Sequence, residues 1–222
     1  MVSQARAEAT RQKIIDSSIE LFREFGFSGT NLKQIHRKSG VSAGAFYYHF
    51  NSKEEVAFAV IDQVAVRMAE LRNDFVGTPE SGLENVILMA FQLSWLIGQD
   101  VAFWTAAYLE QAMARLDKHS SDAVAGRVQL FVDAIAATIQ PSELRAGVTP
   151  EQAARTMVTV IYGCFTMSDL IKGDTTARVV ECWRILLPGL VAPDSLSRFE
   201  SVLSAAAARY RGPGAGNGDL LD

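Results

Sequence analysis

The chain has 222 residues, of which 49% are hydrophobic and 21% are charged, and its formal net charge at pH 7 is −4. This composition is typical of a globular protein and excludes fibrous and wholly disordered chains. Polar side chains interrupt every apolar stretch before the roughly 20 residues of a membrane span, and the N-terminus lacks a signal-peptide segment, so we expect a cytoplasmic protein with no membrane partner.

Apolar residues recur at helical spacing from end to end, and no segment has the sustained alternation of a strand. The sequence therefore predicts an all-α fold. In the first helix Ile15, Ile19 and Phe22 share one stripe. This helix is predicted to end at Gly26, because glycine readily adopts the left-handed conformation of a helix C-cap.

Two short helices follow. Thr30 is the predicted N-cap of a helix over residues 31–39, which ends at Gly40. Ser42 is the predicted N-cap of a helix over residues 43–50. Both assignments rest on the hydroxyl oxygen, which accepts a hydrogen bond from a backbone N–H of the first turn.

Longer helices are predicted for the rest of the chain. Ser52 and Glu55 match a capping box that opens a helix to about residue 75. Thr149 and Gln152 match a second capping box, with Pro150 at the first helical position. The other helices are predicted over residues 79–98, 101–116 (capped by Asp100), 125–139, 150–172, 177–190 and 194–211, before a Gly-rich disordered tail over 212–222.

The first three predicted helices have the layout of a helix-turn-helix, in which the last helix enters the major groove of DNA. A helical hairpin that only packs on its neighbours has the same layout. The segment GVSAGAFYYHFNSKEEV favours DNA binding, because Phe46 and Phe50 face inward while four polar side chains are expected at the surface. These four are Tyr47, Tyr48, His49 and Lys53.

The distribution of charge supports this assignment. Residues 1–55 contain eight Lys and Arg against six Asp and Glu, a net +2. Residues 56–222 contain thirteen against nineteen, a net −6. DNA binding requires cations that face phosphates, so only the N-terminal part suits double-stranded DNA as a partner.

This N-terminal part closely resembles the TetR family of bacterial repressors. The resemblance is dense from about Arg11 to Phe58, through TRQKIIDSSIELFREFGFSGTNLKQI, and beyond that it extends only to the number and lengths of the helices. It implies a helix-turn-helix DNA-binding domain over 1–55 and a ligand-binding and dimerisation domain over 56–211. It also implies a homodimer that binds a palindromic operator, represses transcription and is released by a small-molecule effector.

The resemblance also implies which residues contact DNA. Thr30, Tyr47, His49 and Lys53 match residues that contact backbone phosphates. Ser42 to Ala45 match the first turn of the recognition helix, which lies nearest the base edges. The full DNA-binding set is Thr30, Lys33, Ser42, Ala43, Gly44, Ala45, Tyr47, Tyr48, His49 and Lys53.

We expect few direct hydrogen bonds between side chains and bases. Ala43 and Ala45 stand where many relatives have side chains that hydrogen-bond to bases. Contacts of these alanines with thymine methyl groups, donors from Lys33 or Tyr48, and DNA shape would supply more of the specificity. Gly44 would permit close approach to DNA or simply start the helix.

Aromatic and methionine residues are dense after residue 56, where the resemblance implies ligand binding. The predicted ligand-binding residues are Met89, Trp95, Trp104, Tyr108, Phe131, Met157, Ile161, Phe165 and Trp183. Ordinary core packing is the alternative for each of them.

A weaker resemblance links the segments LRAGVTPEQAARTMVTVIYG and ECWRILLPGL to actinobacterial γ-butyrolactone receptors. The tryptophan expected in the ligand helix of that subgroup has no counterpart in AVAGRVQLF. The effector is therefore predicted only as a small apolar or amphipathic molecule.

Dimerisation is predicted on the helix over 150–172 and one of the two helices that follow, because two helices from each subunit make a four-helix interface. The small residues Ala153, Ala154 and Gly163 would permit close approach. The alternative is that these helices close the core of the monomer.

Cys164 and Cys182 fall within apolar helical patterns without neighbouring metal ligands, so we expect reduced core residues, with redox sensing as the alternative. We expect no cofactor and no metal. An enzyme is disfavoured, because the chain lacks GxSxG, HExxH and phosphate-binding glycine motifs and its three histidines are scattered. A helical small-molecule-binding protein or enzyme without DNA binding is the alternative function.

Overall fold

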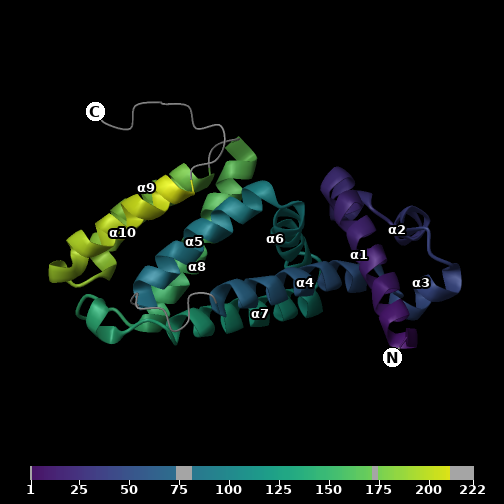
Figure 1. Ribbon diagram of the computed structural model, residues 1–222, viewed down its shortest axis with the longest axis horizontal. Coiled ribbons are helices and arrows are strands. Elements are labelled where there is room, and N and C mark those ends of the chain that lie inside the picture. Colours follow the sequence, from purple (N-terminus) through teal and green to yellow (C-terminus); the bar gives the residue numbers. More distant parts are fainter. Residues whose placement is uncertain (1, 74–81, 172–174, 211–222) are drawn as a thin grey trace. The chain divides into compact units, whose positions relative to one another are not determined.

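The computed structural model describes residues 2–73, 82–171 and 175–210, which are helical almost throughout (Figure 1). Within these ranges it contains no strand, only one antiparallel bridge between Leu144 and Val191. The predicted all-α fold is confirmed. The α-helices are α1 (Val2–Gly29), α2 (Leu32–Ser39), α3 (Ala43–His49), α4 (Lys53–Asn73), α5 (Gly82–Gln99), α6 (Val101–Met113), α7 (Lys118–Ala136), α8 (Pro150–Ile171), α9 (Thr175–Leu190) and α10 (Leu196–Arg209).

The chain divides into two compact units. Unit 1 consists of the described residues of Met1–Glu70 and Asp100–Ala125, and unit 2 of those of Leu71–Gln99 and Gly126–Asp222. Unit 1 thus joins α6 to the N-terminal helices, although α6 is far from them in sequence. The predicted functional boundary near residue 55 stays a prediction, and the predicted disordered tail over 212–222 lies outside the described residues.

Unit 1 is organised around α1, which contacts α2, α3 and α6. The predicted stripe of α1 is buried, with Ile15 and Phe22 fully inaccessible to solvent. Gly26 interrupts the helix with φ 68° and ψ 175°, and one further turn continues to Gly29. The predicted end at Gly26 is therefore a kink, which the missing side chain of glycine permits.

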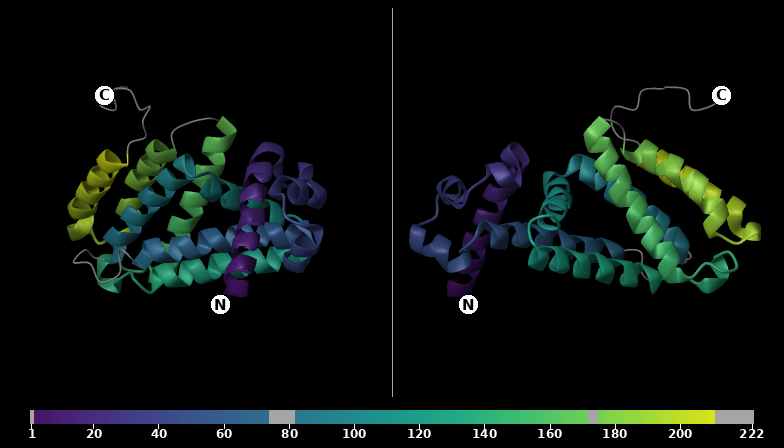
Figure 2. Two further views of the ribbon diagram at one scale, coloured as in Figure 1. Left: turned by 45° about the vertical axis from the view of Figure 1, so that its right-hand side comes forward. Right: turned by 180° about the vertical axis from the view of Figure 1, so that it is seen from behind.

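Unit 2 is organised around α5, which contacts α8, α9 and α10, and α9 in turn contacts α8 and α10 (Figures 1 and 2). Leu83, Ile87 and Phe91 of α5 are fully buried, as expected for a helix with neighbours on several sides. Trp183 of α9 and Phe199 of α10 complete this core.

Two predicted helix starts are confirmed by their hydrogen bonds. The carboxylate of Asp100 accepts from the backbone N–H of Ala102 at 2.8 Å and caps α6. Thr149 and Gln152 exchange side-chain to backbone hydrogen bonds of 3.0 and 3.2 Å, the reciprocal pattern of a capping box, at the start of α8.

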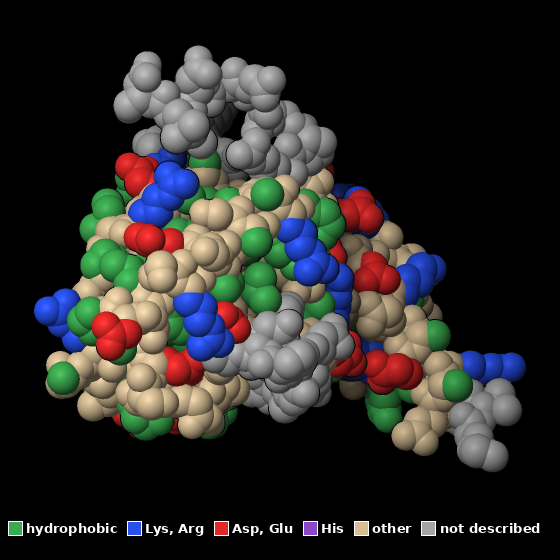
Figure 3. Space-filling view, turned by 60° about the vertical axis from the view of Figure 1, so that its left-hand side comes forward, with side chains coloured by type: hydrophobic (Ala, Val, Ile, Leu, Met, Phe, Trp, Pro, Cys, Tyr) green, Lys and Arg blue, Asp and Glu red, His purple; other side chains and the backbone are tan. Residues whose placement is uncertain are grey.

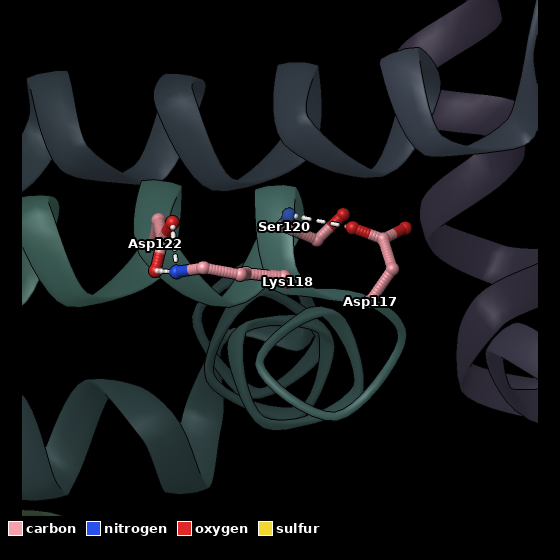
Figure 4. Close-up of polar contacts among 4 residues, drawn as sticks. All are labelled: Asp117, Lys118, Ser120 and Asp122. Carbon is pink, nitrogen blue, oxygen red and sulfur yellow. Dashed lines mark hydrogen bonds and ion pairs between the residues drawn. The ribbon is translucent and has the colours of Figure 1, made fainter.

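The predicted start of α7 was too late. The segment 118–122 was expected to be a loop, but α7 begins at Lys118. Asp117 accepts a 2.8 Å hydrogen bond from the backbone N–H of Ser120, and Lys118 pairs with Asp122 one turn later at 2.8 Å (Figure 4). These local contacts stabilise a first turn whose composition is that of a loop.

Among the described helices, none is by itself long and apolar enough to cross a membrane. The consecutive helices α5 and α6 reach the required length and composition only when they are taken together.

Candidate nucleic-acid interface

The helix α2 begins at a different cap from the predicted one. Asn31 is the N-cap, since its side chain accepts from the backbone N–H of Gln34 at 3.0 Å and the Gln34 side chain accepts from the backbone N–H of Asn31 at 2.8 Å. The prediction that Thr30 is the N-cap was wrong, because its side chain is buried and bonded elsewhere. The Thr30 hydroxyl lies 2.8 Å from the carbonyl oxygen of Gly26 and 3.2 Å from that of Leu21. A phosphate contact by Thr30 would require this hydroxyl to leave both acceptors.

The turn between α2 and α3 is held by local contacts. Gly40 ends α2 in the left-handed conformation, with φ 62° and ψ 21°. A ring nitrogen of His36 lies 3.0 Å from the carbonyl oxygen of Val41. The Ser42 hydroxyl accepts from the backbone N–H of Ala45 at 3.3 Å, which confirms Ser42 as the N-cap of α3. These bonds fix the direction in which α3 leaves α2.

The first turn of α3 is open to solvent. Ser42, Ala43 and Gly44 are exposed, and Ala45 is half-buried. A Cβ added at Gly44 would meet no described atom within 4 Å. The turn expected nearest the base edges is therefore accessible, and its side chains are short.

Phe46 anchors the other side of α3. It is fully buried, and its ring centre lies 5.1 Å from that of His36 and 5.4 Å from that of Tyr47. Tyr47 is exposed beside this anchor, and Tyr48 is 79% exposed. The tyrosine hydroxyls therefore stand on the outer side of a helix that is fixed from within, as an interface requires.

His49, the last residue of α3, and Lys53, the first residue of α4, are the remaining predicted phosphate contacts. His49 is half-buried, with its ring centre 5.0 Å from that of Tyr48. The Lys53 ammonium donates a 2.7 Å hydrogen bond to the carbonyl oxygen of Phe27 and lies 4.0 Å from the centre of the Phe27 ring. An ammonium has three donors, so a phosphate contact by Lys53 is compatible with this bond.

Arg37 of α2 is an exposed cation that the sequence analysis missed. Lys33 and Arg37 are both exposed on α2, whereas Lys38 pairs with Glu20 of α1 at 2.7 Å. Arg37 lies in the last turn of α2, where the run His36-Arg37-Lys38 was the available signal. On the face of the molecule in Figure 3, by contrast, the described Lys and Arg side chains are interspersed with Asp and Glu.

The predicted ligand-binding residues fall into both units. Trp104 and Tyr108 belong to unit 1, and the other seven belong to unit 2. In unit 2, Met89, Met157, Ile161, Phe165 and Trp183 are buried, Phe131 is half-buried and Trp95 is 37% exposed. The structure therefore gathers five of the nine into the interior of one unit.

Trp104 and Tyr108 of α6 face α1. Their rings stack with centres 5.6 Å apart, and the guanidinium of Arg23 lies 5.8 Å from the centre of the Trp104 ring. The hydroxyl oxygen of Tyr108 is 2.8 Å from the position that a Cβ on Gly26 would occupy. These two aromatic residues fill the contact between α6 and the kink of α1.

Trp183 differs from an ordinary core tryptophan. Its side chain is fully buried in α9, and its indole N–H has no hydrogen-bond partner among the described residues. A buried donor without a partner is energetically costly.

No group of three or more potential metal ligands occurs in the described part of the chain.

Residues 14–60, which include α2 and α3, match the family model described as bacterial regulatory proteins, tetR family. The match covers 47 of the 222 residues and shows a TetR-type DNA-binding domain in that segment. The resemblance read from the sequence is thereby confirmed, and the N-terminal unit carries a TetR-type helix-turn-helix.

Two curated relatives illustrate how far the similarity extends. The chain is 50% identical over 80 residues to the HTH-type transcriptional regulator SrpR of Pseudomonas putida, an alignment that covers 36% of this chain and 35% of SrpR. The chain thus spans about a third of that regulator's length. It is 28% identical over 211 residues to the A-factor receptor protein of Streptomyces griseus, covering 90% of this chain and 70% of the receptor.

Solved TetR structures share the fold. A γ-butyrolactone receptor described as ArpA-like has a TM-score of 0.70 and 24% identity, covering 92% of this chain and 99% of its own. The TetR family protein CprB from Streptomyces coelicolor, solved in complex with its operator sequence, has a TM-score of 0.70 and 24% identity, covering 91% and 98%. The chain therefore shares its fold with these two proteins.

Proposed function

We propose that this protein is a ligand-responsive transcriptional repressor of the TetR family. It binds a palindromic operator as a homodimer in the cytoplasm, is released by a small apolar or amphipathic effector, and has no enzymatic activity. The observation that carries the proposal is the exposed first turn of α3, held from behind by buried Phe46, within the residues that match the family.

The proposed contacts with DNA follow from exposure. Ser42 to Ala45 and Tyr48 face the base edges, and Lys33, Tyr47, His49 and Lys53 contact phosphates or neighbouring bases. Arg37 joins the phosphate contacts because it is exposed on the adjoining helix. Thr30 is left out of this proposed set, because its hydroxyl donates inward to main-chain carbonyl groups.

The open turn also bears on how the operator is recognised. Ala43, Gly44 and Ala45 offer no side-chain hydrogen bond to a base. Most of the affinity is then sequence-independent and falls with salt, and the specificity depends on methyl contacts and DNA shape.

The proposed dimer surface is the exposed side of α8 and α9. On α8 it runs through Arg155, Thr159, Gly163 and Met167, which recur every fourth residue and are exposed. On α9 it includes Ile185, which is 74% exposed. Together with Met167, which is 44% exposed, Ile185 places exposed apolar side chains on both helices, and a second subunit would cover them.

Two of the small residues predicted for this surface lie elsewhere. Ala153 and Ala154 are both fully buried within unit 2, so they close the core of the protomer. Gly163 is exposed, and a Cβ there would meet no described atom within 4 Å. Of the three, only Gly163 is placed to permit close approach of a second subunit.

The interior of unit 2 is the proposed effector site. Met157, Ile161 and Phe165 of α8 are buried in the same unit as Trp183. The unpartnered indole N–H of Trp183 favours an effector with a hydrogen-bond acceptor on an otherwise apolar body, since binding would then satisfy this donor.

Salt-dependent binding to the DNA upstream of the protein's own gene tests the proposal. Fluorescence anisotropy would compare this DNA with a scrambled duplex for the wild type, Lys33→Ala and the matched control Lys118→Ala, an exposed lysine on α7. We expect preference for the native duplex and a salt slope reduced by about one in Lys33→Ala alone. Equal, weak binding of all three proteins to both duplexes would instead favour a helical ligand-binding protein without an operator.

A further inference from the structure

The two cysteines of the chain meet where α8 packs against α9. Cys164 lies on α8 and Cys182 on α9, and their sulfur atoms are 3.7 Å apart. Both are free thiols in this structure, and the sequence contains no other cysteine. They are 18 positions apart in the sequence, so their contact is a product of the packing of the two helices.

Sulfur atoms at this separation are not covalently bonded, since a disulfide bond is about 2.0 Å long. The Cys164 thiol instead donates a hydrogen bond to the sulfur of Cys182. The two thiols differ in their access to solvent. Cys164 is only 3% exposed, whereas Cys182 is half-buried. A small oxidant can therefore reach the sulfur of Cys182 first, with the second sulfur already beside it.

We propose that Cys164 and Cys182 form an oxidisable dithiol, which hydroperoxides convert into an intramolecular disulfide that joins α8 to α9. The Cys182 thiolate attacks one peroxide oxygen, the O–O bond breaks, and the other oxygen leaves as water or an alcohol after it takes up a proton. The sulfur of Cys164 then attacks the resulting sulfenic sulfur, and the displaced hydroxide takes the Cys164 proton and leaves as water. Two thiols are oxidised and one hydroperoxide is reduced.

The environment of the pair assigns the two roles. Burial, together with the adjacent Cys182, raises the pKa of the Cys164 thiol to about 12, so Cys164 stays protonated. The thiolate is the nucleophile towards peroxide, so the first attack belongs to Cys182. Cys164 is the resolving thiol, because contact with the sulfenic sulfur compensates for its weak ionisation.

Intact-protein mass spectrometry tests this site in the full chain. The reduced protein would be treated with hydrogen peroxide under native conditions, then denatured and alkylated with N-ethylmaleimide. We expect a mass lower by two hydrogen atoms, no added maleimide, and recovery of two alkylated thiols after reduction. Tryptic digestion should yield the peptide 156–172 joined to the peptide 179–184.

Single-cysteine variants separate the two roles. In Cys164→Ser, dimedone should trap a sulfenic acid on Cys182. In Cys182→Ser, Cys164 should react with peroxide at least about tenfold more slowly than Cys182 does in Cys164→Ser, because Cys164 remains buried and protonated. Equal reaction of both variants would contradict the assigned roles.

Three results would overturn the proposal: two free thiols after treatment, disulfides between chains, or a disulfide that forms only in guanidinium-unfolded protein. The site does not depend on DNA binding, so it stands or fails independently of the proposed repressor function.

Discussion

The ammonium of Lys53, at the first residue of α4, donates a 2.7 Å hydrogen bond to the carbonyl oxygen of Phe27, near the end of α1. The same ammonium lies 4.0 Å from the centre of the Phe27 ring. Lys53 therefore links α1 to α4, the helices that precede and follow the α2–α3 segment in the chain. In the proposed function its charge contacts a phosphate.

Replacing this lysine should separate its two roles. Lys53→Met keeps much of the side-chain volume but removes the charge and the donor. We expect the free energy of unfolding to fall by about 1 kcal/mol. We also expect the salt slope of operator binding to fall by about one. Urea denaturation and anisotropy at several salt concentrations measure the two effects, and an unchanged salt slope would show that Lys53 serves the fold alone.

Tyr47 allows the hydroxyl to be tested without disturbing the packing. Tyr47→Phe retains the ring contacts with His36 and Phe46, which lie 6.3 and 5.4 Å away between ring centres. We expect unchanged thermal stability and an operator affinity about fivefold weaker, the effect of one lost hydrogen bond. Tyr210→Phe, which removes the hydroxyl of a half-buried tyrosine at the C-cap of α10, is the matched control. Full affinity of Tyr47→Phe would remove its hydroxyl from the proposed contacts.

Gly26 should tolerate no side chain. In Gly26→Ala the residue must either keep φ 68° at a conformational cost or straighten the kink, and its Cβ would lie 2.8 Å from the hydroxyl oxygen of Tyr108. We expect a loss of stability of about 1–3 kcal/mol. Tyr108→Phe in the same chain should restore part of it, because the clashing oxygen is gone while the backbone strain remains. A double-mutant cycle by urea denaturation checks this, and strict additivity would contradict the close contact.

Asp100 should contribute a pH-dependent part of the stability. Partial burial raises the pKa of its carboxyl, but hydrogen bonds from Arg67 and the backbone of Ala102 lower it further, so the net pKa lies below its ordinary value of 3.8. The folded state therefore binds this proton less readily than the unfolded state. The contribution is complete above pH 3.8 and declines as the pH falls below it. Asp100→Asn should be less stable at neutral pH, and its difference from the wild type should shrink in acid, as measured by urea denaturation from pH 3 to pH 7.

Local chemistry made the helix starts at Asp100 and Thr149 predictable, because a cap is completed within three residues. Adjacent Thr30 and Asn31 were harder to separate, since both side chains can cap and the choice depends on which is buried by tertiary packing. The start of α7 was missed because a polar segment with a capping Asp117 has the composition of a loop.

Contacts between distant segments were beyond the sequence. Periodicity placed Cys164 and Cys182 on apolar helix faces, but it could not bring their sulfur atoms together. In the same way, nothing local indicated that Tyr108 lies beside Gly26. The recognition helix was predicted more completely, because its cap, its anchor Phe46 and its exposed tyrosines all lie within one short segment.

The vacant space around Gly44 has a consequence for how repressors of the proposed kind diverge. A Cβ added there meets no described atom within 4 Å outside its own stretch of helix, and neighbouring Ala43 is already exposed, so a larger polar residue at either position would extend from the surface and not from the core. Mutation can therefore change the preferred operator of a descendant without the compensating core substitutions that a buried position would require.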